Sequence, residues 1–169
     1  MGLIAALAAL LGTTHAAPSA PSAGGLTKVR EQFIVDPPPT PSSHASTIED
    51  TPGGLVASWF GGTAEKEKDV CIWVARQENG KWLPPVKVAD GVEPDDGQLY
   101  PTWNPVLFQP KQGPLLLFYK IGPSPDTWWG RYLTSEDHGR TWTFQSLDAP
   151  WQYTRAVVPH PTDPASVFV

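Results

Sequence analysis

The sequence repeats itself at an interval of 60 residues, and this repeat constrains the fold more than any other feature of the chain. Gly53-Gly54-Leu55 corresponds to Gly113-Pro114-Leu115, and Trp82 corresponds to Trp142. A turn that contains glycine precedes each of these two tryptophans. Independent landmarks at one offset indicate two copies of a single structural unit.

Each copy is predicted to form four short strands. Val70, Ile72 and Val74 alternate with Cys71 and Trp73, and turn-forming residues bound such runs, as is typical of strands. The predicted strands are residues 43–49, 54–60, 69–76 and 82–89 in the first copy, and 103–109, 114–121, 129–136 and 141–147 in the second. Four-stranded units that repeat in this way are typical of propeller blades. We therefore expect an all-β partial β-propeller of about two blades, with residues 26–35 as a candidate extra strand.

The composition excludes several other classes of protein. The 20 prolines and 15 glycines argue against a helical bundle. The net charge of -5 argues against a basic nucleic-acid groove, so no nucleic-acid partner is expected. Because Cys71 is the only cysteine, we expect no disulfide, no disulfide-linked partner and no cysteine-based zinc site. His15 and His160 make no metal set with His44, and neither a metal nor another cofactor is expected.

The N-terminal residues predict export. Residues 3–11 are an apolar run, and Thr14 and Ala16 suit the cleavage site of a signal peptide. The run is shorter than the roughly 20 residues of a membrane span, so we expect a signal peptide over residues 1–17, secretion and no membrane span. The basic segment that normally precedes such a run is missing, which leaves an alanine-rich extension as the alternative. The remaining predicted parts are a flexible linker over 18–25, blades over 26–147, and a divergent or truncated tail over 148–169.

One eight-residue segment carries a specific turn motif. Residues 135–142 read S-E-D-H-G-R-T-W, in which short polar side chains bond local backbone amides and glycine takes a positive φ. The segment resembles the Asp-box, or BNR repeat, of sialidase-like propellers. The resemblance implies a structural role, at the rim of the propeller, for four residues: Ser135, Asp137, Gly139 and Trp142.

The resemblance to sialidase (neuraminidase)-like proteins extends over about residues 42–147, including Gly54-Leu55-Val56-Ala57-Ser58-Trp59-Phe60 and Trp103-Asn104-Pro105-Val106-Leu107. It implies a six-bladed propeller, of which this chain would be a fragment with two blades. It further implies a secreted carbohydrate-active parent protein that hydrolyses a terminal sugar on an acidic glycan or polysaccharide. Because two blades do not surround a substrate, the 169-residue chain alone is expected to be inactive. The alternatives are a non-catalytic glycan-binding propeller and a rhamnose–glucuronate lyase or hydrolase that uses a histidine.

The same resemblance suggests catalytic residues. His44 stands where sialidases carry an arginine that clamps the substrate carboxylate, and an imidazole does not reproduce that bidentate clamp. A histidine there could instead act as a general acid or base. Glu65 and Asp69, on the loop after the second strand, are the candidates for the sialidase acid/base, and the sequence does not choose between them.

Four residues near the start of the second blade are candidates for substrate binding. Tyr100, Trp103 and Trp128 offer aromatic faces for sugar rings, and Asn104 offers an amide for sugar hydroxyls. Packing between blades is the alternative role for Trp103 and Trp128.

Overall fold

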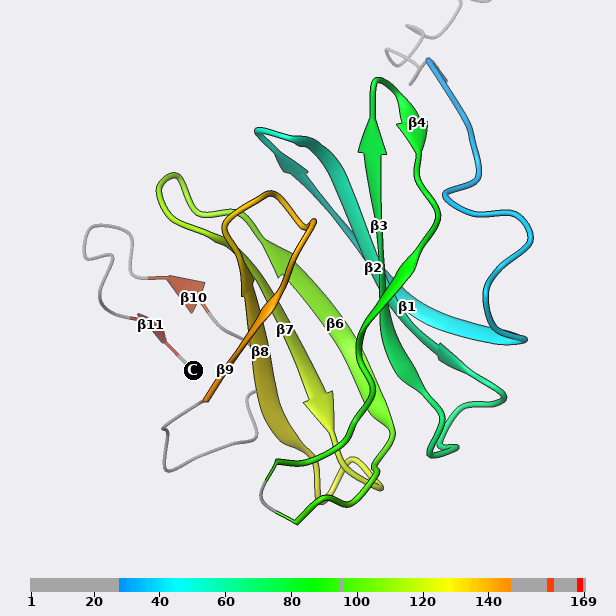
Figure 1. Cartoon of the computed structure of the whole chain (residues 1–169), viewed down its shortest axis with the longest axis vertical. Helices are drawn as coiled ribbons and strands as arrows, with labels where there is room; N and C mark the ends of the chain where they lie inside the picture. Colours follow the sequence, from blue (N-terminus) through cyan, green and yellow to red (C-terminus); the bar gives the residue numbers. More distant parts are fainter. Residues whose placement is uncertain (1–27, 95, 147–157, 160–166, 169) are drawn as a thin grey trace, which may run out of the picture. The chain divides into compact units, whose positions relative to one another are not determined.

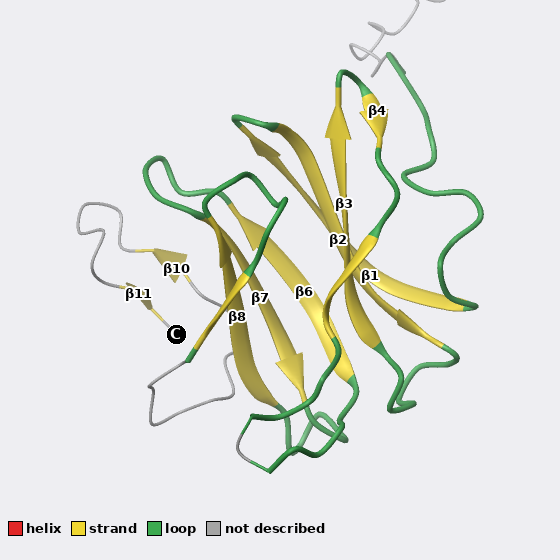
Figure 2. Ribbon diagram, in the orientation of Figure 1, coloured by secondary structure: helices red, strands yellow, loops and turns green. Residues whose placement is uncertain are grey.

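The computed structural model describes residues 28–94, 96–146, 158–159 and 167–168. The chain divides into a unit of residues 1–32 and a unit of residues 33–169, and all elements below belong to the second unit. Strands and loops make up the described residues, without a helix (Figures 1 and 2). The predicted signal peptide, the linker and most of the tail lie outside the described residues.

The first sheet is formed by residues 42–89. Its strands are β1 (Ser42–Thr51), β2 (Gly54–Gly62), β3 (Cys71–Glu78), β4 (Lys81–Trp82) and β5 (Val86–Ala89). The order is β1-β2-β3-β4, with β5 also paired to β3, and all pairs are antiparallel. The predicted strand 82–89 is interrupted because Pro84 and Pro85 have no N–H to donate. The extra strand predicted over 26–35 is wrong for residues 28–35, which form no strand.

The second sheet repeats the same plan. Its strands are β6 (Thr102–Phe108), β7 (Leu115–Ile121), β8 (Trp129–Ser135) and β9 (Thr143–Gln145), in the order β6-β7-β8-β9. All neighbours are antiparallel. A further antiparallel pair joins β10 (Val158–Pro159) to β11 (Val167–Phe168). Two blades of a partial propeller, as predicted from the repeat, are confirmed.

A β-bulge at the same place in each sheet confirms that the blades are copies. The pairing of β1 with β2 shifts between His44 and Thr47, and that of β6 with β7 shifts between Trp103 and Val106. Within each bulge one residue has a positive φ: 48° at Ala45 and 43° at Asn104. The extra residue changes the direction of the side chains at the start of β1 and β6.

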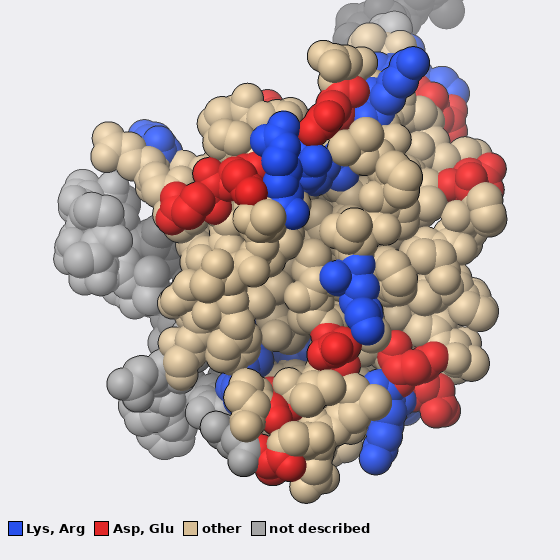
Figure 3. Space-filling model, viewed as in Figure 1, with Lys and Arg blue, Asp and Glu red and all other residues tan. Residues whose placement is uncertain are grey.

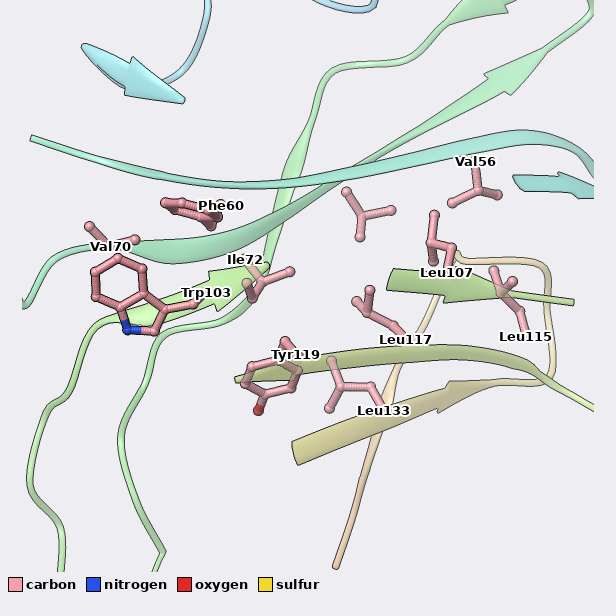
Figure 4. Close-up of a cluster of buried hydrophobic side chains, with 11 residues drawn as sticks. Val56, Phe60, Val70, Ile72, Trp103, Leu107, Leu115, Leu117, Tyr119 and Leu133 are labelled. Atoms are coloured by element: carbon pink, nitrogen blue, oxygen red, sulfur yellow. The ribbon is translucent and has the colours of Figure 1, made fainter. Parts of the chain in front are cut away.

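The two sheets face each other across one apolar core. Along β7, buried and half-buried residues alternate, as expected when one face of a sheet is covered. Figure 4 shows that side chains from both blades meet in this core. Its members are Val56, Phe60, Val70, Ile72, Val74, Trp103, Leu107, Leu115, Leu117, Tyr119 and Leu133.

The Asp-box turn closes the outer corner of the second blade. The Asp137 carboxylate accepts hydrogen bonds from the Thr141 N–H at 2.8 Å and the Thr141 hydroxyl at 2.7 Å. The Ser135 hydroxyl donates to the same carboxylate and accepts from the Gly139 N–H. The turn lies against the first blade, because a Cβ on Gly139 would stand 3.2 Å from the Arg76 side chain.

Candidate functional site

The predicted catalytic and substrate-binding residues lie at one end of both sheets. This site end is where β1, β3, β6 and β8 begin and where β2 and β7 stop. Thr102 joins the blades here, since its N–H and its hydroxyl both donate to the Val70 carbonyl, at 3.2 and 3.0 Å. The Asp-box turn lies at the opposite end, together with a groove of about 380 Å³ lined by Val74, Arg76, Leu83, Pro84, Val86, Gly139 and Arg140. That groove is therefore remote from the candidate chemistry.

A row of four rings runs across the site end from one blade to the other. The ring centroids of His44 and Phe60 are 5.5 Å apart, those of Phe60 and Trp103 are 5.7 Å apart, and those of Trp103 and Trp128 are 4.8 Å apart. The Lys120 ammonium lies 5.2 Å from the Trp128 ring centroid, which is a cation–π contact. We call these four rings the aromatic row. It brings together three of the predicted residues: His44, Trp103 and Trp128.

His44 forms the exposed end of the aromatic row. Its ring stacks on Phe60, which is only 3% exposed, and its Nε2 lies 2.8 Å from the Ser42 hydroxyl. Two such contacts hold the imidazole in one orientation, while His44 as a whole stays exposed. An oriented, accessible imidazole can exchange a proton with a bound molecule.

The loop that carries the predicted carboxylates is closed by Asp69. The Asp69 carboxylate accepts hydrogen bonds from the N–H and the hydroxyl of Thr63, and these bonds lower the pKa of Asp69. An ionised, hydrogen-bonded carboxylate is suited to fixing the loop and poorly suited to donating a proton near neutral pH. Glu65 lies on the same loop with its side chain exposed. Both catalytic assignments remain predictions.

The four predicted substrate-binding residues differ in their surroundings. The Trp103 ring is 2% exposed and its N–H donates to the Gly122 carbonyl at 2.8 Å, so it packs in the core between Phe60 and Trp128. Trp128 and Asn104 are half-buried at the site end. Tyr100 is also half-buried and packs against Trp129 rather than on the aromatic row. Substrate contact by these residues stays a prediction.

A buried ion pair lies next to Trp129, the ring that packs against Tyr100, and the sequence did not predict it. The Arg131 guanidinium donates two hydrogen bonds to the Glu93 carboxylate, and both side chains are about nine-tenths buried. Arg131 also stacks on Trp129, whose ring contacts Tyr100 at 5.1 Å between centroids. The pair ties residues 90–101, which connect the blades, to β8. The two residues are 38 positions apart in the chain, and no local pattern indicates that they meet.

The single cysteine also lies at the site end, where it is 8% exposed. The Cys71 thiol donates to the Asp69 carbonyl at 3.1 Å, and burial raises the pKa of the thiol. A thiol in this environment is mostly protonated and unreactive at neutral pH.

Three further observations concern the described residues: possible metal ligands, surface charge and membrane-spanning helices. No group of three or more His, Cys, Asp or Glu side chains in this part of the chain is placed to hold a metal ion. On the face shown in Figure 3, basic and acidic side chains form small mixed groups separated by uncharged surface. The described residues likewise include no helix that is long and apolar enough to cross a membrane.

Comparison with known proteins agrees with the repeated blades and the Asp-box turn. No curated protein matches the chain. The family model of the BNR repeat-like domain matches residues 53–167, which include most of the first blade and all of the second. The chain therefore belongs to the family of BNR repeat-like domains.

Proposed function

We propose that this chain supplies part of the active site of a secreted, sialidase-like protein that hydrolyses a terminal sugar on an acidic glycan or polysaccharide. The observation that carries the proposal is the aromatic row, which links His44 on one blade to Trp128 on the next. Sugar rings stack on aromatic faces, while their hydroxyl groups need directional polar partners. Phe60 and Trp103 in the middle of the row are buried, so the half-buried Trp128 offers the aromatic face and the exposed His44 offers the polar partner.

The proposed chemistry divides the polar groups by their environment. His44 and Glu65 take the acid and base roles, because both side chains are exposed at the site end. Asp69 positions the loop through Thr63. The Lys120 ammonium beside Trp128 adds positive charge where the sugar would bind, which favours an anionic substrate.

Product release from acidic glycans tests the proposal. The full-length protein that contains these two blades and its His44→Ala variant would be incubated with a panel of sialylated, glucuronate-containing and neutral glycans, and released sugars would be measured by mass spectrometry. We expect release from an acidic glycan that His44→Ala lowers by about 100-fold or more. The matched control is His138→Asn at the opposite end, where φ is 58° and Asn tolerates that backbone. Equal release by His44→Ala and the wild type would contradict the proposal.

A glycan-binding protein without turnover is the second candidate, and the environment of Asp69 favours it. Its carboxylate is already hydrogen-bonded to Thr63 and is not free to transfer a proton, and the amide oxygen of an asparagine can accept the same hydrogen bonds. Binding to a glycan without product, unchanged in Asp69→Asn, would support this function. A lyase acting on rhamnose–glucuronate linkages would be recognised by an unsaturated, ultraviolet-absorbing product.

A further inference from the structure

The two ring nitrogens of His44 have different surroundings at the site end. Nε2 lies 2.8 Å from the Ser42 hydroxyl, so this nitrogen is already hydrogen-bonded within β1. Among the residues that the structure describes, none forms a hydrogen bond with Nδ1, and His44 as a whole is exposed. The stacking contact with Phe60 limits rotation of the ring. A molecule bound at the site end would therefore meet Nδ1 rather than Nε2.

Ser42 is held in place by contacts of its own. It is half-buried, and it pairs with Gly62 on β2. Its carbonyl accepts a hydrogen bond from the Thr40 hydroxyl at 3.0 Å. Because that bond uses the only proton of the Thr40 hydroxyl, the Ser43 hydroxyl is the donor in its contact with Thr40 at 3.1 Å. Ser43 thus directs its hydroxyl toward Thr40, while Ser42 directs its hydroxyl toward His44.

These three hydroxyl-bearing residues pack closely on the β2 backbone at Gly61. A Cβ on Gly61 would stand 2.5 Å from Thr40 Oγ1 and 2.8 Å from the Ser42 carbonyl oxygen. The Trp73 indole N–H donates to the Gly61 carbonyl at 3.1 Å and fixes the same stretch of strand. The partner of the imidazole therefore stands on packed backbone, which is what a precisely oriented side chain requires.

One hydrogen bond to Ser42 suits both protonation states that an acid or base needs. When neutral His44 carries its proton on Nε2, that N–H donates to Ser42 Oγ, and the lone pair on Nδ1 can accept a proton. After Nδ1 has taken a proton, both ring nitrogens bear one, and the bond from Nε2 to Ser42 is unchanged. The ring does not have to move when the proton arrives or leaves.

We propose that His44 exchanges protons with its ligand through Nδ1, and that Ser42 is the positioning residue that accepts the hydrogen bond from Nε2 and keeps that nitrogen away from the ligand. This inference rests on the proposed function and deepens it, because it names the atom through which His44 acts. The placement of the two nitrogens can be tested without any sugar.

Alkylation of the full chain with bromoacetate tests which nitrogen of His44 is accessible. An unprotonated ring nitrogen displaces bromide and forms a bond to the carboxymethyl carbon, and the proton on the other nitrogen then passes to water. Peptide mapping isolates the segment with His44, and chromatography after hydrolysis separates the Nδ1 product from the Nε2 product. We expect the Nδ1 product to exceed the Nε2 product by about tenfold, and Ser42→Ala to lower that ratio by about tenfold, as the loss of one hydrogen bond predicts.

Two further variants provide the controls for the alkylation. Ser42→Thr keeps a hydroxyl and should keep the ratio of the wild type. Ser43→Ala removes the neighbouring hydroxyl, which bonds Thr40 rather than His44, and should also leave the ratio unchanged. The proposal is overturned by an excess of the Nε2 product in the wild type, by an equal ratio in Ser42→Ala and the wild type, or by a His44 that stays unmodified in the folded chain.

Sugar release by the full-length protein separates this inference from the proposed function. With an acidic glycan as substrate, Ser42→Ala should lower kcat by about tenfold with little change in KM, and Ser42→Thr should restore kcat. Release that Ser42→Ala does not alter would overturn the positioning role. An absence of release by the wild type would contradict the proposed function, whereas the alkylation would still decide where the two nitrogens lie.

Discussion

Three carboxylates of this chain have three different structural roles. Asp137 closes the Asp-box turn, Asp69 closes the loop at the site end, and Glu93 neutralises the buried Arg131. The first use is evident in the sequence because its partners lie within four residues. The second lies on the loop predicted to carry it, and its catalytic role stays a prediction. The third depends on tertiary packing and could not be foreseen.

Removing the charge of Asp137 should destabilise the protein in a pH-dependent way. Hydrogen bonds from Thr141 and Ser135 hold the pKa of Asp137 well below its usual value. A carboxyl whose pKa is lower in the folded state contributes stability that is complete above about pH 4 and is lost as the pH falls toward its folded pKa. We expect Asp137→Asn to cost about 1–2 kcal/mol at pH 7, and the difference from wild type to shrink below about pH 4.

Urea unfolding at pH 7 and pH 3 measures this difference. Glu136→Gln is the control, because Glu136 is the exposed neighbour of Asp137. A difference between Asp137→Asn and wild type that stays constant between the two pH values would show that the carboxylate charge is not what closes the turn.

Gly91 should not tolerate a side chain. Its φ is 73°, and a Cβ would stand 1.9 Å from the Tyr100 carbonyl oxygen, which is a backbone atom. We expect Gly91→Ala to cost more than about 2 kcal/mol of unfolding free energy. Gly97→Ala is the control, since φ there is also positive but nothing lies within 4 Å of the added Cβ. It should cost only about 1 kcal/mol, and equal costs in thermal unfolding would contradict the clash.

At the scale of strands, most of the fold could be predicted from the sequence. Alternation in residues 114–121 and 129–136 located β7 and β8 to within one residue at each end. The break in the strand predicted over 82–89 was missed, although Pro84 and Pro85 signal it. The bulges at Ala45 and Asn104 were also missed, because a bulge depends on how two strands pair and leaves no periodic trace in one of them. Those bulges determine which side chains face the site end, so the site was less predictable than the sheets.

The ion pair of Glu93 with Arg131 should be the strongest polar link between the blade connection and β8. Arg131→Met leaves a buried carboxylate unpaired, and we expect it to cost about 3–5 kcal/mol. Adding Glu93→Leu should recover part of that loss, because no charge then stays buried. Chemical unfolding of the wild type, the two single variants and the double variant measures the coupling.

An exposed ion pair provides the control for this cycle. The side chains of Arg140 and Glu78 are 49% and 36% exposed and 3.1 Å apart, so their coupling should be no more than about 1 kcal/mol. Equal coupling energies in the two pairs would mean that burial does not strengthen the contact of Glu93 with Arg131.

At the scale of the molecule, the two blades are halves of one hydrophobic core. Phe60, from the first blade, is 3% exposed and contacts Trp103 of the second. The blades should therefore unfold together rather than one after the other.

Truncating Phe60 tests whether the blades are coupled. We expect Phe60→Ala to cost about 3–5 kcal/mol and to increase hydrogen exchange in β7 and β8 as well as in β2. Phe144→Ala, at a residue that is 44% exposed, should change stability by no more than about 0.5 kcal/mol. Faster exchange in Phe60→Ala that is confined to β1–β5 would show that the blades open independently.

The position of Cys71 makes its thiol a built-in probe of local opening at the site end. Because this lone thiol is shielded beside Asp69, an alkylating reagent can reach it only when the strands around it separate. The rate at which the unmodified chain takes up one label therefore reports how often this end of the sheets opens. A bound ligand that slows the labelling would reveal itself without any engineered probe.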